Sequence, residues 1–305
     1  MRPRRGATDL AGVLLVDKPA GLTSHDVVSA LRTATGERRI GHSGTLDPMA
    51  TGLLVVIIGR ATRLERYLVG HDKSYDARIA FGKLTDTLDA EGTVTETAPV
   101  PPQVLDETFA RDVLARFVGP QDQIPPAYSA IKRGGMSAHR VARAGGTPVL
   151  EPRSVEVYEA SLRGINAKGP TWDVSFSVSK GTYIRSLARD IGEAAGTLAH
   201  LSDLRRTLAG TAAIDGALSL EAAVAAAEEG LLEDHLVDPV TLLGMPVVEV
   251  TLEDVRDGRS VAASDAAIAE DEAVAIVAAD ELLGVYRRRG NMLAPETVLS
   301  PGVPR

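Results

Sequence analysis

The apolar residues of the chain gather into short runs separated by turn residues. Residues 12–16 (GVLLV) and 53–58 (LLVVII) are continuous apolar runs with the length of a buried strand, and the turn DKPAG follows the first. Residues 74–81 (SYDARIAF) and 172–181 (WDVSFSVSKG) alternate polar and apolar positions. This alternation predicts strands with one face in the core.

Helices are predicted where the apolar period lengthens to three or four residues. The segment TSHDVVSALRTATG offers an N-cap at Thr23 or Ser24, an apolar face that includes Val28, and a stop at Gly36. Further helices are predicted for residues 107–117, 182–196 and 219–230, the last with Ser219 as its cap. Strands and helices alternate irregularly, with several meander-like pairs, which predicts a mixed α/β fold around a largely antiparallel central sheet.

Two segments do not fit the pattern of a regular strand or helix. Residues 123–149 (QIPPAYSAIKRGGMSAHRVARAGGTPV) are rich in Gly, Pro and Arg, and we interpret them as a long excursion with one set of helical turns. Loops of this length inside compact domains usually serve a function. Residues 238–250 are interpreted as a linker into a last β module. We therefore expect a catalytic domain over 1–245 and a small module over 247–305.

Composition narrows the class of protein. The 305 residues include 44% hydrophobic residues and no cysteine, which excludes disulfides, thiolate chemistry and cysteine-ligated zinc. No apolar stretch approaches the ~18 residues of a membrane span. The basic N-terminus, MRPRRGATDL, lacks the apolar segment of a secretory signal. We expect a cytoplasmic protein that does not associate with membranes.

The net charge of −8 hides two basic blocks. Residues 1–75 carry a balance of +4 and residues 128–210 one of +5, whereas residues 76–127 carry −5 and residues 211–305 carry −12. Local basic density matters more than total charge for binding a polyanion. Ordinary solvated surface is the simpler explanation if charge is considered alone.

Several kinds of site are disfavoured by spacing. No two glycines stand two apart, so the dinucleotide pattern GxGxxG does not occur, and GK[ST] is absent as well. The six histidines are scattered, with no HxxxH pair. We therefore expect no metal and no cofactor.

Asp47 lies in RRIGHSGTLDPMATGLLVV (38–56), among basic and apolar neighbours. GHSGT nearly matches the nucleophile elbow GxSxG, but Thr45 replaces its second glycine, which argues against a hydrolase. The DxD pattern of aspartyl-phosphate enzymes is broken by Met49. Asp-Pro pairs commonly set turns, and on spacing alone this is the simpler interpretation of Asp47.

GHSGTLDPMATGLL resembles the aspartate motif of uridine-to-pseudouridine isomerases, in particular the TruB type that modifies the T-arm of tRNA. The resemblance extends to GVLLVDKPAGLTSHDVV, DKSYDARIAFGKLTDTLDAEG, QIPPAYSAIK, SKGTYIRSLARDIG and LSDLRRT, in the family's order over about residues 10–210. It implies a pseudouridine synthase fold, conversion of uridine 55 of tRNA to pseudouridine, and no cofactor. Family members commonly end in a PUA-type RNA-binding module, and the short acidic tail here suggests a reduced, PUA-like version.

The resemblance assigns the chemistry to Asp47. Its carboxylate would act as a nucleophile at C1′ or C6, or as the base that removes a sugar proton. The family pairs this aspartate with the arginine of its TYIR motif, here Arg185, and an adjacent arginine lowers a carboxylate pKa by ~1–3 units. Asp47 would then stay ionised in an otherwise apolar pocket.

A stacked uracil must be extruded before it can react, at a cost of a few kcal/mol. By resemblance, Tyr75 stacks on the uracil, Tyr183 packs in the pocket, Leu204 lies against the base and His42 fills space near the flipped nucleotide. Without the surrounding motifs, the two tyrosines and the leucine would be assigned to the core, and the histidine to an exposed turn.

The two basic blocks provide candidates for binding phosphates, which position RNA without specifying its sequence. These candidates are Lys18, Arg38, Arg39, Lys132, Arg133, Arg140, Arg143, Arg205 and Arg206. Folded RNA is recognised by shape and by splayed loop bases. The excursion at 123–149 is the best candidate for a flexible clamp over the T-stem-loop.

Other functions fit parts of this pattern. Guide-RNA-dependent uridine isomerases share the motifs, but they work with partner proteins and a larger RNA-binding tail, whereas no obligate protein partner is expected here. A tRNA-binding folding chaperone with secondary catalysis would keep its cellular function in Asp47→Asn. A hydrolase would turn over small esters without RNA.

Overall fold

The computed structural model describes residues 8–129, 132–133, 136–137, 146, 150–166, 168–253, 255, 258–263 and 268–305. The chain forms two compact units. Unit 1 contains the chain up to Pro48 together with Gly52–His71 and Leu208–Arg305, and unit 2 contains Met49–Thr51 and Asp72–Thr207.

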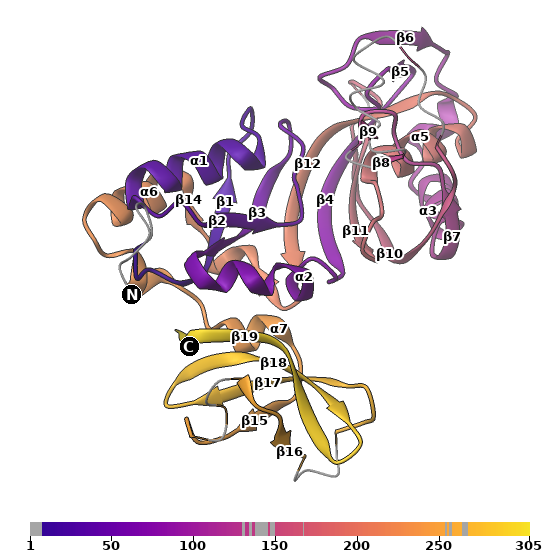
Figure 1. Cartoon of the computed structure of the whole chain (residues 1–305). Helices are drawn as coiled ribbons and strands as arrows, with labels where there is room; N and C mark the ends of the chain where they lie inside the picture. The colour runs from indigo at the N-terminus through magenta and orange to yellow at the C-terminus, as the bar shows by residue number, and fades with distance from the viewer. Residues whose placement is uncertain are drawn as a thin grey trace. The chain divides into compact units, whose positions relative to one another are not determined.

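Unit 1 begins with strands and a helix and ends in a β module (Figure 1). Before the module, its elements are β1 (Gly12–Lys18), α1 (Ser24–Thr35), β2 (Ile40–Ser43), β3 (Thr51–Ile58), η1 (Gly59–Leu64), α2 (Glu65–Leu68), β13 (Ala212–Ala213), η3 (Ile214–Gly216), β14 (Leu218–Ser219), α6 (Leu220–Glu228), η4 (Leu232–His235) and α7 (Pro239–Leu243). The first residue of β3 belongs to unit 2. The module contains β15 (Val247–Glu249), β16 (Val261–Ala262), β17 (Ala273–Ala278), β18 (Glu281–Arg289) and β19 (Met292–Pro304), in the spatial order β15-β17-β18-β19-β16.

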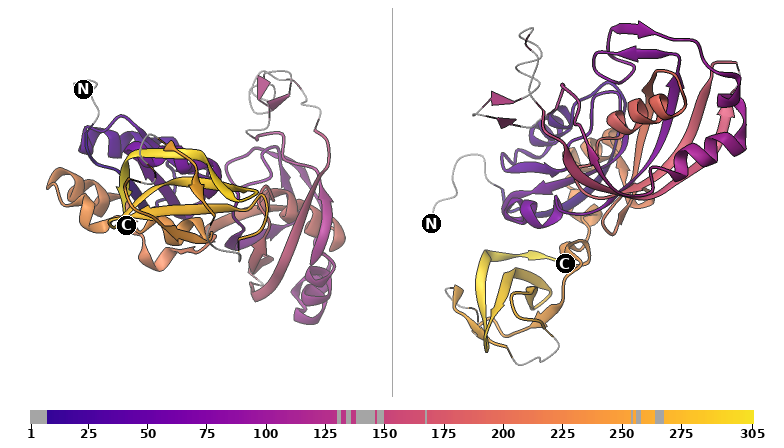
Figure 2. Two further views of the ribbon diagram at one scale, coloured as in Figure 1. Left: turned by 60° about the horizontal axis from the view of Figure 1, so that its bottom comes forward. Right: turned by 90° about the vertical axis from the view of Figure 1, so that its right-hand side faces the viewer.

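Unit 2 combines a sheet with helices and a small hairpin (Figure 2). Its elements are β4 (Lys73–Phe81), β5 (Lys83–Thr85), β6 (Val94–Thr97), η2 (Pro102–Leu105), α3 (Glu107–Ala115), β7 (Gly119–Gln123), β8 (Lys132–Arg133), β9 (Met136–Ser137), β10 (Arg153–Asn166), β11 (Thr171–Val178), α5 (Ile184–Ala194) and β12 (Ala199–Ala209), whose last two residues belong to unit 1.

The first helix has the ends that the sequence predicts. Thr23 is the N-cap of α1: its hydroxyl accepts from the Asp26 backbone N–H, and the Asp26 carboxylate accepts from the Thr23 backbone N–H. This reciprocal capping box satisfies two backbone donors that the helix itself leaves open. Gly36 ends the helix with φ of 70°, a left-handed conformation that glycine adopts without strain.

The apolar runs of β1 and β3 form neighbouring antiparallel strands, with Gly12 opposite Ile58. On its other side β1 pairs in parallel with β14, so this part of the sheet is mixed. Nearly all residues of β1 and β3 are buried, which explains why their sequences are continuously apolar instead of alternating. Helices α1 and α6 lie side by side and pack near β1 (Figure 1).

One hydrophobic core of unit 1 joins distant parts of the chain. It contains Leu53 and Ile57 from β3, Leu64 from η1, Leu243 from α7 and Val303 from β19. The β module therefore shares buried apolar surface with the N-terminal part of unit 1. A second cluster, which includes Ile276, Tyr286 and Leu293, fills the interior of the module itself.

Three arginines of η1 and α2 bind the last strand of the module. Arg60 donates to the Gly302 carbonyl, and Arg63 donates to the Val298 carbonyl. Arg66 donates to the Thr297 hydroxyl at 2.8 Å and to the Glu296 carbonyl at 3.1 Å. Part of the first basic block therefore holds β19 in place.

The sheet of unit 2 is antiparallel along β7-β10-β11-β4, and β12 follows β4 in the strand order. Buried and half-buried positions alternate strictly along β11, as its sequence predicts. Trp172 of β11 is fully buried and packs edge-to-face against Phe81. Its indole N–H donates to the Val104 carbonyl at 2.7 Å. Helices α3 and α5 contact each other and pack on the sheet.

These elements confirm the predicted mixed α/β fold, with a largely antiparallel sheet, flanking helices and a C-terminal β module. The interpretation of 238–250 as a linker is wrong in part, because Pro239–Leu243 form a short helix capped by Asp238 and Val247–Glu249 pair with β17. Most of the 123–149 excursion lies outside the described residues. Within the described part of the chain, no helix has the length and apolar character needed to cross a membrane.

Candidate functional site

Asp47 lies in a loop of unit 1 that is fixed on both sides. The buried hydroxyl of Ser24, in the first turn of α1, accepts from the Leu46 N–H at 2.9 Å and donates to the Leu46 carbonyl at 3.2 Å. The Pro48 carbonyl accepts from the Gly21 N–H at 2.8 Å. Asp47 itself is half-buried. The loop therefore holds this carboxylate on a backbone with little freedom to move.

Lys18 is the buried cation beneath this loop. It is 0% exposed, and its ammonium donates to the carbonyls of Pro19 at 2.9 Å, Leu22 at 2.7 Å and Pro48 at 3.2 Å. A buried ammonium is stabilised only when its donors find partners, and these carbonyls supply them. Lys18 thus ties the end of β1 to the Asp47 loop. Its predicted contact with an RNA phosphate remains a prediction.

His42 and the two arginines before it lie on or next to β2. His42 is half-buried and stands opposite Val56 of β3. Arg38 and Arg39 are exposed at the entry to the strand. Their side chains are therefore accessible to solvent, and their predicted contact with RNA phosphates remains a prediction.

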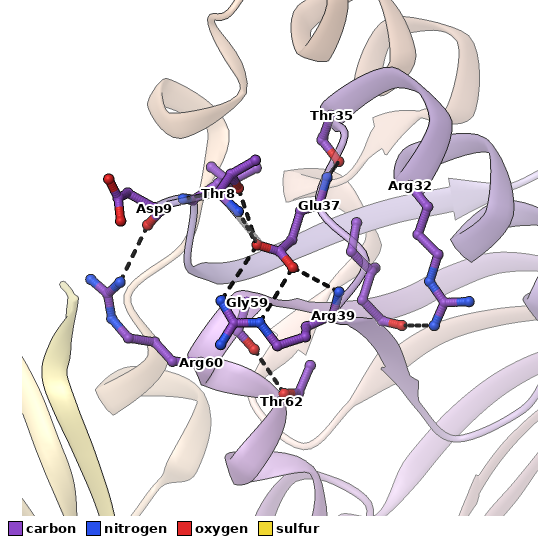
Figure 3. Close-up of polar contacts among 11 residues, drawn as sticks. Thr8, Asp9, Arg32, Thr35, Glu37, Arg39, Gly59, Arg60 and Thr62 are labelled. Carbon is purple, nitrogen blue, oxygen red and sulfur yellow. Dashed lines mark hydrogen bonds and ion pairs between the residues drawn. The ribbon is translucent and has the colours of Figure 1, made fainter. Parts of the chain in front are cut away.

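Glu37 organises the segment that carries these arginines (Figure 3). Its side chain is fully buried and accepts from the backbone N–H groups of Arg39 at 2.7 Å and Thr8 at 2.8 Å. The Arg39 guanidinium lies 3.3 Å from the same carboxylate. Burial alone raises the pKa of Glu37, but the hydrogen bonds from Arg39 and Thr8 outweigh it and lower the pKa overall.

Glu37→Gln is therefore expected to destabilise the protein by about 1.5–3 kcal/mol at pH 7, the usual worth of hydrogen bonds to a charged group. Because the folded-state pKa lies below the unfolded one, this contribution is present above the ordinary glutamate pKa and disappears as the pH falls through the folded value. Denaturant unfolding at several pH values measures it. The exposed Glu229→Gln is the control, and equal effects of both variants would contradict the assignment.

In unit 2, the predicted base-contacting residues come from neighbouring strands and a helix end. Tyr75 on β4 is 7% exposed and Leu204 on β12 is 5% exposed, so both lie almost wholly inside the unit. Tyr183 is half-buried and forms the N-cap position of α5. The three large side chains therefore lie on two neighbouring strands and at the start of α5.

Arg185 lies in the first turn of α5 and is 5% exposed. Its guanidinium donates to the Thr87 carbonyl at 3.0 Å and to the Tyr128 carbonyl at 3.0 Å, and it lies 3.5 Å from the carboxylate of Asp89. Asp89 is 4% exposed, so the ion pair is shielded from water on both sides. This geometry fixes the guanidinium through its fork of donors.

Neighbouring residues of its own loop also hold the Asp89 carboxylate in place. Thr87 donates its hydroxyl to Asp89 at 2.5 Å, and the Glu91 N–H donates at 3.1 Å. Leu88 adopts φ of 63°, which is unusual for a leucine, and its backbone bonds to Leu201 on β12. Such strain persists only where surrounding contacts enforce it, and the Arg185 pair is among those contacts.

The remaining predicted phosphate contacts of unit 2 differ in accessibility. Arg205 lines a hollow of about 490 Å³ together with Arg78, Arg163, Asp76, Asp173 and Asp203, where positive and negative side chains balance. Arg206 is only 1% exposed. Burial, with the charges of Arg206 and Lys180, lowers the pKa of Lys73 to about 8 although Asp72 opposes the shift. Burial is the largest cause of this lowered pKa, and the two neighbouring cations add to it.

Four candidates belong to the excursion. Lys132 and Arg133 form β8, which pairs with β9, and the structure describes their backbone alone. Arg140 and Arg143 lie outside the described residues. Their predicted contacts with RNA remain predictions.

Two residues next to the predicted site were missed from the sequence. Asp89 lies within DKSYDARIAFGKLTDTLDAEG, and Gln123 is the first residue of QIPPAYSAIK. Both stretches already carried the family resemblance, so the signal was present. A single Asp or Gln in a polar loop has no distinguishing mark until its partner, Arg185 or Tyr183, is known.

Solved structures share this fold. A Cbf5–Nop10–Gar1 complex contains a chain that matches with a TM-score of 0.71 and 27% identity, covering 96% of this chain and 85% of that one. An H/ACA RNP bound to a substrate RNA containing 2′-deoxyuridine matches with a TM-score of 0.71 and 25% identity over 94% of this chain and 84% of that one. The fold is that of the pseudouridine synthases, a class of isomerases.

The family follows from sequence matches over most of the chain. Residues 32–184 match the TruB family pseudouridylate synthase N-terminal domain, and residues 185–243 match the tRNA pseudouridylate synthase B C-terminal domain. Proteins named tRNA pseudouridine synthase B are similar: that of Opitutus terrae is 46% identical over 73% of this chain and 89% of its own length, and that of Paenarthrobacter aurescens is 40% identical over 96% of both. The chain therefore belongs to the TruB family of pseudouridylate synthases and is an isomerase.

Proposed function

We propose that this enzyme converts uridine 55 in the T-arm of tRNA to pseudouridine. The proposal is supported by its family, by relatives that are named tRNA pseudouridine synthase B, and by the matching motif GHSGTLDPMATGLL. The structural observation that carries it is the loop of Asp47, which buried contacts from Ser24 and Lys18 fix on both sides. Preorganised groups of this kind are typical of catalytic sites.

The reaction breaks the bond between N1 of uracil and C1′ of the ribose, turns the base, and joins C5 to C1′. C5 loses a proton and N1 gains one, so the reaction needs neither a redox partner nor an external group. The Asp47 carboxylate acts at C1′ or C6 as a nucleophile, or removes a sugar proton as a base. Arg185 keeps this carboxylate ionised in the substrate complex.

The base must leave the RNA stack before it reacts, and the enzyme offsets that cost of a few kcal/mol with contacts of its own. Tyr75 stacks on the extruded uracil, at ~1–3 kcal/mol for a base on an aromatic ring. Leu204 and Tyr183 pack around it, and His42 occupies space near the flipped nucleotide. Basic side chains at Arg38, Arg39 and in the excursion bind the backbone of the T-stem-loop.

The C-terminal module, residues 247–305, contributes little to RNA affinity in this proposal, and residues 1–245 form the catalytic domain. The three arginines at the end of β18 are occupied by acids and carbonyls of the module itself: Arg287 pairs with Glu296 at 2.9 Å, Arg289 pairs with Asp271, and Arg288 donates to the Gly290 carbonyl at 3.1 Å. Neutralised cations release few counterions when RNA binds. The enzyme acts in the cytoplasm, where unmodified tRNA is present.

The direct experiment incubates the purified protein with an unmodified tRNA transcript. Pseudouridine is then mapped by carbodiimide-dependent stops of reverse transcription. A new stop at the T-loop uridine is expected, with stoichiometric modification. A stop at another uridine alone would overturn the substrate assignment, and activity that needs an added guide RNA would favour a guide-dependent isomerase instead.

A further inference from the structure

Gln123 has a buried side-chain amide that forms two hydrogen bonds with the start of α5, the helix that contains Arg185. It is the last residue of β7 and is 2% exposed. Its side-chain oxygen accepts from the Tyr183 backbone N–H at 2.8 Å, and its side-chain nitrogen donates to the Tyr183 carbonyl at 3.1 Å. A side-chain amide can satisfy a backbone donor and a backbone acceptor at once, and burial limits competition from water.

Tyr183 depends on this outside contact because of its place in the chain. It is the N-cap of α5, but a tyrosine side chain does not cap its own helix, and the structure gives it no side-chain cap hydrogen bond. Its carbonyl also accepts from the Leu187 N–H at 3.1 Å, the first bond of the helix. Gln123 therefore sets the backbone position from which Tyr183 projects, two residues before Arg185.

The residues that follow Gln123 make further contacts with the same helix start. The Ile124 carbonyl accepts from the Ser186 hydroxyl at 2.8 Å. The Tyr128 carbonyl accepts from the Arg185 guanidinium at 3.0 Å. The root of the 123–149 excursion is thus joined to the first turn of α5 by successive hydrogen bonds, and the Gln123 side chain contributes two of them.

We propose that Gln123 is a positioning residue that couples the excursion to the placement of Tyr183 and Arg185 for pseudouridine formation. The inference rests on the proposed function, because it assigns these two residues to the reaction. A strand end, an amide and a helix start form one continuous link, so a shift at the root of the excursion moves the backbone of the reacting site. Displacements of about 1 Å at such positions lower rates by about 100-fold.

The first test replaces the amide by an unbranched apolar side chain of similar length. Gln123→Met is expected to lower the single-turnover rate at saturating tRNA transcript by about 10- to 100-fold, while the Kd for the transcript changes by less than threefold. Gln121→Met is the matched control on the same strand, because Gln121 donates to the Phe117 carbonyl at 2.7 Å and not to α5. The control should keep its rate within twofold.

Folding is checked in both variants with the single tryptophan of the chain. Trp172 is fully buried in unit 2, so its emission and thermal unfolding report whether the unit remains intact. A loss of rate in a variant with normal emission is a loss of positioning.

The second test uses Gln123→Glu, whose side chain mimics the amide only when it is protonated. The protonated acid keeps one donor and one acceptor, whereas the ionised form keeps acceptors alone and faces the Tyr183 carbonyl. The rate of this variant relative to wild type should therefore fall as the pH rises, over a range that burial moves above the ordinary glutamate pKa. The relative rate of Gln123→Met should stay flat with pH.

Several results would overturn the inference: a rate for Gln123→Met within twofold of wild type, a loss seen entirely in Kd, or a relative rate of Gln123→Glu that does not depend on pH. If Gln123→Met fails to fold, the pH series of Gln123→Glu decides alone. Wild-type enzyme in the same assay tests the proposed function separately. Pseudouridine at a different uridine would refute that proposal while the variants still test the link.

Discussion

Asp47→Asn is expected to abolish pseudouridine formation, with a rate at least about 10⁴-fold below wild type, the scale seen when a reacting side chain is removed. The substitution keeps the size of the side chain and removes its charge and its ability to attack or to accept a proton. Because Leu46 and Pro48 hold the loop through their backbone atoms, the fold should be preserved. Binding of tRNA should change by less than threefold.

Reverse-transcription mapping after carbodiimide treatment measures the activity, and filter binding measures the affinity. Asp9→Asn, an exposed acid of the same unit, is the control and should stay within twofold of wild type. Cells that carry only Asp47→Asn distinguish the enzyme from a folding chaperone. A chaperone would support normal tRNA function without isomerisation, whereas an enzyme whose product matters would not.

Arg185→Met is expected to lower the rate by about 10²- to 10³-fold, the usual cost of losing one preorganised charged donor. It should also destabilise the protein by about 3–5 kcal/mol, because Asp89 would remain buried without its cation. The affinity for tRNA should fall much less than the rate. Equal losses in rate and affinity would count against a role in the reaction.

A double variant separates the two effects of this substitution. Arg185→Met combined with Asp89→Asn removes both charges of the buried pair, so a large part of the lost stability should return. The rate should stay low, because the cation is still missing. Recovery of the rate with stability would show that Arg185 serves the fold alone. Arg111→Met on α3, where the arginine pairs with Glu107 on the surface, is the control for removing an arginine from unit 2.

Local signals predicted much of the fold. Thr23 and Gly36 delimit α1 because each acts on backbone groups only a few residues away, the hydroxyl at the start of the helix and the left-handed glycine at its end. The alternating residues around Trp172 predict a strand because successive side chains point to opposite faces and only one face is buried. Such features depend on neighbours in sequence, which a pattern can reveal.

The features that escaped prediction depend on partners far away in the chain. The sequence of residues 238–250 has the pattern of a linker, but the burial of Leu243 in the core of unit 1 makes a helical turn favourable there. The family motifs single out Asp47 and Arg185 as site residues, and these roles remain predictions. The buried pair of Arg185 with Asp89 joins residues 96 positions apart, and no spacing rule connects them.

In the proposed reaction, the carboxylate of Asp47 drives isomerisation of the T-loop uridine. The most direct measurement uses a tRNA that carries tritium only at C5 of uridine 55, because forming the bond between C5 and C1′ releases that hydrogen to water. Wild-type enzyme should release one equivalent per tRNA in a single turnover, and Asp47→Asn should release none while still binding the RNA. Release by Asp47→Asn at a rate close to that of wild type would show that another group drives the reaction.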